Sequence, residues 1–323
     1  MTPSRRRFLC SRGPRRAVAR GLTLVEMMVA MVIGMVLVAG LSTVFVNSSV
    51  ARNEIELSAD VIENGQYALV ALSRDLAQTG FYGTLVVPAG GAIDLCSTDP
   101  AVWATSLTAY AVGLNNTDPD PACLARKAGT DAVFIQRAST CTTTEAGAGC
   151  AEEAGQAYLQ VSECGMEYSL IPYVVARGVD PALTLQTKAC DGTRAPKRRL
   201  VRRFYYISTD NVLSSVDITP NGTLPPVALV ENIEQMQIEY AVDVDGDGTP
   251  DAFSPTPADW SLVVGARFWL LARSTTTSRN GSAALTFEMS DTRFAVPETT
   301  MNFKRRVYST YVAFLTPKSR RES

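Results

Sequence analysis

The chain has 323 residues, of which 46% are hydrophobic and 19% charged, and it contains no histidine. This length allows one large domain or two modest domains with a sizeable core. Without an imidazole the chain has no Ser-His-Asp or Cys-His nucleophile and no histidine-ligated zinc, so we do not expect an enzyme, although carboxylate, Lys and Cys chemistry stays formally open.

The net charge of −2 conceals a strongly basic N-terminus. Residues 1–21 hold seven arginines and no acid, which leaves 23 basic against 32 acidic residues in the rest of the chain, a net of −9. An acidic body lacks the basic surface that neutralises phosphates, so we expect no nucleic-acid partner.

A long apolar segment follows the arginines. Between Leu22 and Val46 the only charged residue is Glu26, and about 20 apolar residues suffice to span the ~30 Å hydrocarbon core as a helix. The arginines are expected to stay in the cytoplasm, which places the body across the membrane. A secretory signal peptide cut near residues 39–40 and a plain single-pass anchor are the alternatives. The first usually has a shorter apolar core, and the second needs no costly intramembrane carboxylate.

The run GLTLVE at residues 21–26, between the basic leader and the apolar helix, resembles the type IV prepilin signature. The resemblance implies that residues 1–21 are a leader, that prepilin peptidase cleaves between Gly21 and Leu22, and that Leu22 is then N-methylated. By the same resemblance, Glu26 is expected to be the fifth residue of the mature chain, where its carboxylate would offset the new amine inside a helical bundle and set subunit register. Leu22 replaces the Phe that is more common in the family, and the leader is long for it.

Two further stretches resemble one branch of that family. ENGQYALVALSRDLAQTGFYG at residues 63–83 is similar to the block that closes the long helix of PilW-type minor pilins, and RRVYSTYVAFL at residues 305–315 is similar to their ending, less sharply. The resemblance implies a minor pilin that helps to initiate type IV pilus assembly, near the pilus tip. The related J-type minor pseudopilins of type II secretion and a membrane-anchored extracytoplasmic binding protein are the competing assignments.

The same resemblance implies partners and a location. The partners are prepilin peptidase and, through the N-terminal helix, other minor pilins and the major pilin. The protein is expected to cross the bacterial inner membrane once with its head in the periplasm, and then to join the pilus at the cell surface.

Residues 22–80 are predicted to form one long helix, with residues 22–46 as its transmembrane half. Gly65 is a weak point, because glycine costs about 1 kcal/mol relative to alanine inside a helix. Charged residues, Glu54 and Asp75 among them, mostly occupy faces away from the head. The apolar stripe expected to pack on the head recurs every seven residues, at Ile55, Ile62, Leu69 and Leu76.

Residues 81–323 are predicted to form an extracytoplasmic, β-rich globular head. No regular helix separates the strand-like segments, so we expect an α+β, pilin-like fold in which the long helix packs on an antiparallel sheet. The cysteine-bearing stretch 90–195 is expected to be an insertion on the rim of the head, and the basic run at 197–203 a solvated strand edge rather than a partner patch. Strands are expected at residues 132–137, 157–161, 168–176, 200–208, 235–242, 262–273 and 307–315.

Six of the seven cysteines lie in the head, and none forms a CxxC pair. Behind an apolar export segment, they indicate an oxidising compartment and up to three disulfides. Six cysteines allow 15 pairings. We favour pairing between sequence neighbours, over unpaired buried thiols as the alternative: Cys96 with Cys123, Cys141 with Cys150, and Cys164 with Cys190.

The run DVDGDGTPD at residues 243–251 is the most chemically specific stretch of the head. Carboxylates at alternating positions, with glycines that permit a sharp turn, are typical of loops that wrap oxygens around Ca²⁺. The run departs from an EF-hand loop in its glycine pattern and in lacking a glutamate at the twelfth position, and a solvated acidic hairpin turn is the alternative. The expected ligands are the side chains of Asp243, Asp245, Asp247 and Asp251 and the backbone carbonyl of Thr249.

Overall fold

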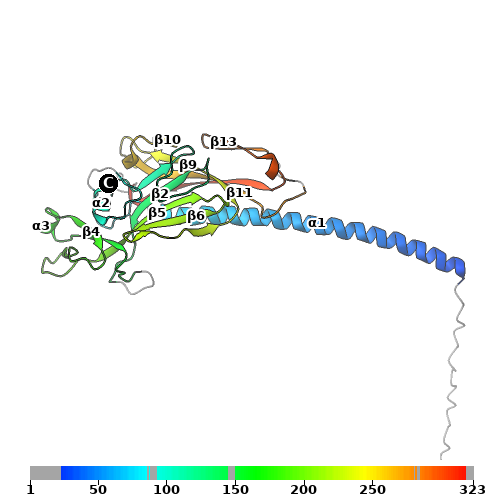
Figure 1. Cartoon of the computed structure of the whole chain (residues 1–323), viewed down its shortest axis with the longest axis horizontal. Helices are drawn as coiled ribbons and strands as arrows, with labels where there is room; N and C mark the ends of the chain where they lie inside the picture. The colour runs from blue at the N-terminus through cyan, green and yellow to red at the C-terminus, as the bar shows by residue number, and fades with distance from the viewer. Residues whose placement is uncertain are drawn as a thin grey trace, which may run out of the picture. The chain divides into compact units, whose positions relative to one another are not determined.

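The computed structural model describes residues 23–85, 87, 93–144, 150–279, 281 and 284–317. The chain divides into two compact units, Met1–Asn53 and Glu54–Ser323. One helix, α1 (Leu24–Leu76), contributes to both units (Figure 1). The helix predicted at residues 22–80 is therefore present over nearly its whole length.

The described part of the first unit consists of the apolar portion of α1. An 18-residue window of this helix reaches a mean hydropathy of 2.5, and none of that window is buried. Leu24, Met35, Leu41 and Phe45 are each at least 70% exposed. By length and composition the helix is able to cross a membrane. A helix that is hydrophobic all round needs lipid or a helical bundle to cover it.

In the second unit, the rest of α1 packs on the head through one face. Ile55 and Ile62 are exposed, so the seven-residue stripe expected from the sequence is wrong over its first half. The helix has two apolar faces, and the buried one contains the small residues Gly65 and Ala68, which let the sheet approach closely. The buried apolar positions follow a spacing of three or four residues: Leu57, Val61, Gly65, Ala68, Leu72 and Leu76.

An eight-stranded antiparallel sheet forms one layer of the head. Its main path runs in the order β1-β2-β5-β3-β4, and β6 pairs with β5, β7 and β8. The eight strands are β1 (Ala111–Leu114), β2 (Ala132–Ala138), β3 (Ala157–Val161), β4 (Tyr173–Arg177), β5 (Lys197–Ile207), β6 (Leu213–Thr219), β7 (Gly222–Thr223) and β8 (Val227–Val230). Two short helices accompany this sheet: α2 (Pro100–Thr105) precedes β1, and α3 (Gly165–Tyr168) lies between β3 and β4.

A four-stranded antiparallel sheet, in the order β10-β9-β11-β14, forms the second layer. Its strands are β9 (Ile233–Val242), β10 (Ala252–Ser254), β11 (Val263–Arg273) and β14 (Arg305–Ala313). A separate hairpin pairs β12 (Thr286–Met289) with β13 (Thr292–Ala295), and two 3-10 turns span Trp260–Leu262 and Glu298–Thr300. Side chains from both sheets and from α1 meet in one hydrophobic core. The expected α+β class, with the long helix on antiparallel sheets, is confirmed.

Four parts of the head differ from the sequence prediction, and the first three concern its strands. Residues 90–195 contribute β1 to β4 to the eight-stranded sheet, so this stretch is part of the sheet and not only an insertion on its rim. The strand expected at residues 168–176 begins later, with β4, because α3 and Pro172 precede it and proline cannot donate to a strand ladder. The short strands β1, β6, β7, β8, β10, β12 and β13 were not expected.

The basic run at residues 197–203 is not a solvated edge. It lies in β5, which pairs with β2 on one side and with β3 and β6 on the other. Arg202 is only 1% exposed, stacks between the rings of Trp103 and Phe134 at 4.9 and 5.0 Å, and donates to backbone carbonyls in the loop before α2. The rings cover the guanidinium and the carbonyls accept from it, so the strand can bury this charge.

Candidate functional site

The expected processing site, Gly21 and Leu22, lies outside the described residues. The described chain begins at Thr23, whose hydroxyl accepts the backbone N–H of Glu26 at 3.3 Å, one residue before α1 starts. This Thr-x-x-Glu spacing is that of a capping box, and the positive end of the helix dipole favours a carboxylate in the first turn. Glu26 therefore stabilises the start of the helix locally, beside the role in subunit register that the resemblance implies.

A buried ion network ties the end of α1 to the eight-stranded sheet. Asp75, whose side chain is 10% exposed, contacts Arg137 of β2 at 2.5 Å and Arg203 of β5 at 3.1 Å. It also accepts the hydroxyl of Tyr205 at 2.6 Å, while Arg203 pairs with Asp217 of β6. Burial raises the pKa of Asp75, but Arg137, Tyr205 and Arg203 outweigh it and hold the pKa below its usual value. Charge thus fixes α1 to β2 and β5, and Arg203 extends the network to β6.

The sequence prediction placed Asp75 away from the head, and the structure corrects this. Leu72 and Leu76, three residues before it and one after, are both fully buried. A residue between two such positions lies at the edge of the same helix face. The position of Asp75 beside two buried leucines was the signal in the sequence. Its partners Arg137 and Arg203 are distant along the chain, so the helix pattern could not reveal them.

A second contact holds α1 at the first residue of the head unit. Glu54 accepts from the Lys304 ammonium at 2.8 Å, from the Ser278 hydroxyl at 2.7 Å and from the Arg279 backbone N–H at 3.2 Å. Hydrogen bonds from Lys304 and Ser278 lower the pKa of Glu54 to about 2. The carboxylate is therefore ionised at any physiological pH and pins this turn of α1 to the start of β14.

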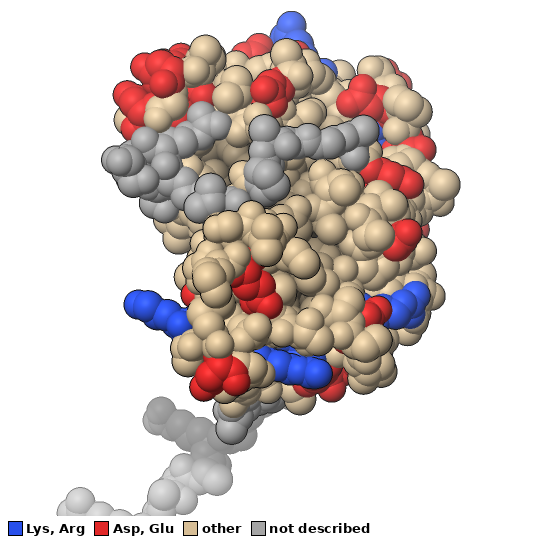
Figure 2. Space-filling model, turned by 90° about the vertical axis from the view of Figure 1, so that its left-hand side faces the viewer, with Lys and Arg blue, Asp and Glu red and all other residues tan. Residues whose placement is uncertain are grey.

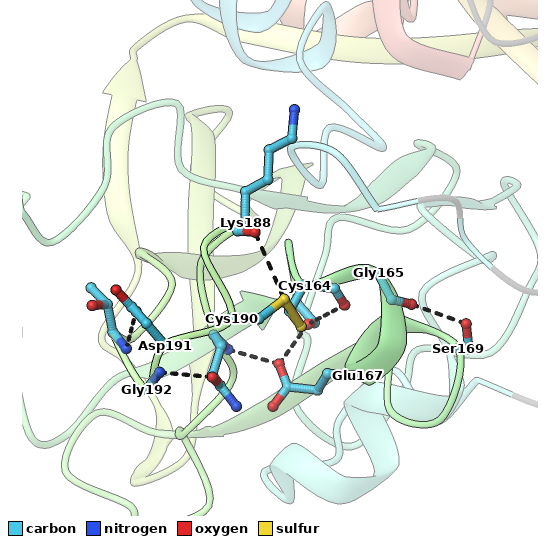
Figure 3. The surroundings of a disulfide bond; sticks show 11 residues. Cys164, Gly165, Glu167, Ser169, Lys188, Cys190, Asp191 and Gly192 are labelled. Carbon is cyan, nitrogen blue, oxygen red and sulfur yellow. Dashed lines mark hydrogen bonds between the residues drawn. A yellow bond between two sulfur atoms is a disulfide. The ribbon is translucent and has the colours of Figure 1, made fainter.

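Three disulfides close loops in the described part of the head. They join Cys96 to Cys123, Cys141 to Cys150 and Cys164 to Cys190, which is the neighbour pairing favoured from the sequence. Figure 3 shows Glu167 of α3 beside the third disulfide. The Glu167 carboxylate accepts the Ser162 hydroxyl at 2.6 Å and the Gln186 N–H at 2.7 Å, so a covalent bond and a carboxylate both hold α3.

The end of the head that carries α3 and β4 presents mostly uncharged side chains. Figure 2 shows this face, on which the charged residues lie mainly toward the margins. Met166 and Leu170, in and just after α3, are 81% and 83% exposed. These apolar side chains therefore project from a loop that a disulfide holds in place.

The acidic loop between β9 and β10 brings some of the expected calcium ligands together. Carboxylate oxygens of Asp243, Asp245 and Asp247 lie within 4.8 Å of one another. Asp243 is buried and accepts the backbone N–H groups of Gly246 and Gly248 at 2.7 and 2.9 Å. Both glycines have a positive φ, 81° and 86°, which a side chain would disfavour. The sequence therefore folds into a tight turn around the Asp243 carboxylate.

The other two expected ligands lie differently. The Asp251 carboxylate is not in that group of three; its Oδ2 accepts the N–H groups of Val244 and Asp245 at 2.7 and 3.4 Å and closes the loop. Thr249 donates its N–H and its hydroxyl to Asp247. Three carboxylates with a preformed turn are a partial oxygen set for a hard cation, because Ca²⁺ takes six to eight oxygens.

Comparison with protein families gives two matches. The family described as Type IV Pilus-assembly protein W matches residues 204–314, which include β6 to β14 and the last four residues of β5. The family described as Prokaryotic N-terminal methylation motif matches residues 16–42. Neither match includes residues 63–83, on which much of the resemblance seen in the sequence depends. Comparison with curated proteins and with solved structures found no match.

A methylation motif, an apolar α1 and an antiparallel β head define a type IV pilin-like protein. Within that class, the match at residues 204–314 makes this part of the head similar to PilW-type pilus-assembly proteins. Pilin domains of this kind are structural, and they imply contact with other pilus components and processing by prepilin peptidase. The motif and the apolar helix also indicate that the protein is anchored in a membrane.

Proposed function

We propose that this protein is a processed minor pilin that takes part in the initiation of type IV pilus assembly, near the pilus tip, and has no enzymatic activity. One observation carries the proposal: a methylation motif at residues 16–42 and a PilW-type head at residues 204–314 occur on one chain. Prepilin peptidase cleaves between Gly21 and Leu22 and methylates Leu22. Glu26 then lies four residues from the new amine, close enough to offset its charge in an apolar bundle.

Before assembly, the protein crosses the bacterial inner membrane once with its head in the periplasm. The seven arginines of residues 1–21 favour a cytoplasmic N-terminus, and three disulfides in the head suit an oxidising compartment. The apolar part of α1 then leaves the lipid for a helical bundle with other minor pilins and the major pilin, and the head reaches the cell surface.

The mature N-terminus tests this proposal most directly. We expect intact-mass and peptide mass spectrometry of the protein from its own host to find N-methylated Leu22 as the first residue. The variant Gly21→Ala should accumulate uncleaved. Gly34→Ala is the matched control, because a Cβ at Gly34 meets nothing within 4 Å, and it should be processed like the wild type. An intact leader in the wild type, or a cut near residues 39–40, would refute pilin-type processing.

A minor pseudopilin of type II secretion would be processed in the same way, so a second experiment separates the two roles. The match to a pilus-assembly family favours the pilus. Deletion of the gene should reduce the number of surface pili and leave secreted proteins unchanged, and a gene copy on a plasmid should restore the pili. Loss of secretion with normal piliation would assign the protein to the secretion system instead.

We also propose that the acidic loop at residues 243–251 binds Ca²⁺ through Asp243, Asp245 and Asp247, with Asp251 and the Thr249 carbonyl as the remaining candidates. The clustering of the first three carboxylates supports this, since they repel one another without a cation. Calcium bound there would rigidify the turn between β9 and β10.

Isothermal titration of the full chain in detergent micelles tests the calcium proposal. We expect heat of binding with Ca²⁺ and its loss in Asp245→Asn, whose side chain is exposed and whose replacement spares the buried Asp243. Asp210→Asn, which removes an exposed carboxylate outside the loop, is the control. Absence of binding heat at millimolar Ca²⁺ would show that the loop is an acidic hairpin turn.

A further inference from the structure

A buried carboxylate at one end of the four-stranded sheet has more cations around it than it can pair with. Glu234 is 4% exposed, and both of its oxygens are engaged by Arg305, through Nε at 2.6 Å and through Nη2 at 3.2 Å. Arg305 directs its remaining N–H groups to Thr300 and to the Phe303 carbonyl. Because both oxygens of Glu234 and the N–H groups of Arg305 are already engaged, neither residue can make a second strong charged hydrogen bond.

Arg273 stands beside this pair without an acceptor of its own. It is the cross-strand neighbour of Arg305 in the β11–β14 ladder, and its side chain is 20% exposed. Its nearest carboxylate oxygen, on Glu234, is 4.0 Å away, and its Nε is buried without a hydrogen-bond partner. The guanidinium stacks on the Phe303 ring at 4.8 Å. Among the described residues, none accepts a hydrogen bond from this guanidinium, although such a group offers five N–H donors.

Lys127 adds a third cation. Its ammonium donates to the Asn211 side chain at 2.7 Å and to the Glu234 backbone carbonyl at 2.8 Å, and it has no ion pair within the described chain. Burial lowers the pKa of Lys127; Glu234 opposes this effect, and Arg273 and Arg305 add to it. Burial is the main cause of this lowered pKa, and the two guanidiniums oppose the attraction of Glu234 for the ammonium.

These four residues, which we call the Glu234 cluster, carry three positive charges and one negative charge: Lys127, Glu234, Arg273 and Arg305. Water can accept hydrogen bonds from the unpaired N–H donors, but it does not neutralise the net positive charge of the cluster. A guanidinium fork with an ammonium nearby suits a planar or tetrahedral oxyanion, which accepts several N–H bonds at once, better than it suits chloride. The Arg273 side chain is partly exposed, so such an ion can reach it from solvent.

We propose that Arg273 and Lys127 bind a small oxyanion of the carboxylate, phosphate or sulfate type at the Glu234 cluster. The Glu234–Arg305 pair supports this site because it positions β14. Arg273 is held beside it by the charge of Glu234 and by stacking on the Phe303 ring. The inference does not depend on the proposed role in pilus assembly.

Unfolding of the full chain in non-ionic detergent, followed by the fluorescence of its three tryptophans, tests this site. Phosphate, sulfate and acetate are each titrated against chloride at constant ionic strength. Phosphate and sulfate also stabilise proteins by exclusion from their surface, so the readout is the difference between variants. We expect a saturable rise of the unfolding midpoint in the wild type and in Arg293→Gln, which removes an exposed arginine of β13.

In Arg273→Gln the oxyanion affinity should fall about tenfold or more, as expected for a lost charged hydrogen bond. Arg273→Lys keeps the charge but loses the forked arrangement of N–H donors. Its oxyanion affinity should therefore lie between those of the wild type and Arg273→Gln. The anion that saturates at the lowest concentration identifies the preferred type. Equal responses of the wild type and Arg273→Gln to all three anions would overturn the site, and so would a response to chloride alone.

Discussion

At the residue scale, Gly65 shows how a position that looks weak in the sequence is required by packing. Glycine in a helix is costly, and on the sequence alone alanine is the better residue. In the structure the Tyr308 ring of β14 lies directly against Gly65, and a Cβ there would overlap the ring. Gly65 therefore sets how closely α1 approaches the four-stranded sheet.

Gly65→Ala should destabilise the head by about 1–2 kcal/mol, because overpacking of about 1–3 kcal/mol outweighs the gain in helix propensity. The measurement is the urea midpoint of the full chain in detergent, by tryptophan fluorescence. Gln66→Ala, at the exposed neighbouring position, should leave the midpoint unchanged or raise it slightly. A Gly65→Ala protein more stable than the wild type would show that the helix tolerates a wider spacing from β14.

The residues that organise the head were only partly predictable from the sequence. The clustering of Asp243, Asp245 and Asp247 was predictable from their spacing, because they are close along the chain, whereas calcium binding there stays a prediction. Asp75 and Arg202 were expected to face solvent, since a pattern search treats charge as exposed. Each is buried because partners from distant parts of the chain contact it, Arg137 and Arg203 in one case and Trp103 and Phe134 in the other. Sequence periodicity carries no information about such long-range pairs.

At the element scale, α1 is held to the head by packing along one face and by ionic contacts at two points. Glu54 pins its first turn in the head to Lys304, and Asp75 fixes its last turn to the eight-stranded sheet. The two points are about six helical turns apart. The helix is therefore attached to both sheets of the head.

Asp75→Asn should destabilise the head by about 3 kcal/mol, because removing one partner of a buried pair leaves the other charges uncompensated. Here two guanidiniums and the Tyr205 hydroxyl lose their common acceptor. Glu63→Gln, which neutralises an exposed acid on the same helix, is the control and should change the urea midpoint little. Equal midpoints for the two variants would mean that apolar packing alone attaches α1.

Elements were predictable in proportion to their length and regularity. The long helix and the strands β2, β3, β5, β9, β11 and β14 were found within a few residues of their ends. Short strands such as β6 and β8 lack a distinctive alternation; β6 forms because β5 offers it a free side to pair with, and β8 pairs in turn with β6. The prediction of the buried face of α1 was wrong for a related reason. The helix has two apolar faces, and only packing against the sheet determines which of them is buried.

At the scale of the whole molecule, the absence of histidine makes the dependence of stability on pH unusually simple. No side chain with an ordinary pKa titrates between pH 5 and 8 in this chain. Burial raises the pKa of Asp131 from 3.8 to about 7, although the backbone N–H groups of Ile238 and Asn116 oppose it. Asp131 lies between the two sheets, where it joins the start of β2 to β9.

A carboxyl whose pKa is higher in the folded than in the unfolded chain stabilises the fold only while it is protonated. The contribution of Asp131 should therefore be complete near pH 4 and disappear as the pH rises through 7. Glu54 and Asp75 act in the opposite sense, since their lowered pKa values mean that their contributions are lost in acid. Stability should thus be greatest near pH 4–5 and decline towards neutrality.

Between pH 5 and pH 8 the free energy of unfolding should fall by about 2–3 kcal/mol, the value that linkage gives for a pKa of about 7 against 3.8. Urea titrations of the full chain with a chelator present, at four pH values in this range, measure it. Asp131→Asn cannot titrate, so its midpoint should be nearly constant over the range, whatever its absolute stability. A wild-type midpoint that is flat or rises with pH would mean that the two backbone N–H groups keep Asp131 ionised despite its burial. A decline shared equally by Asp131→Asn would assign the effect to another group.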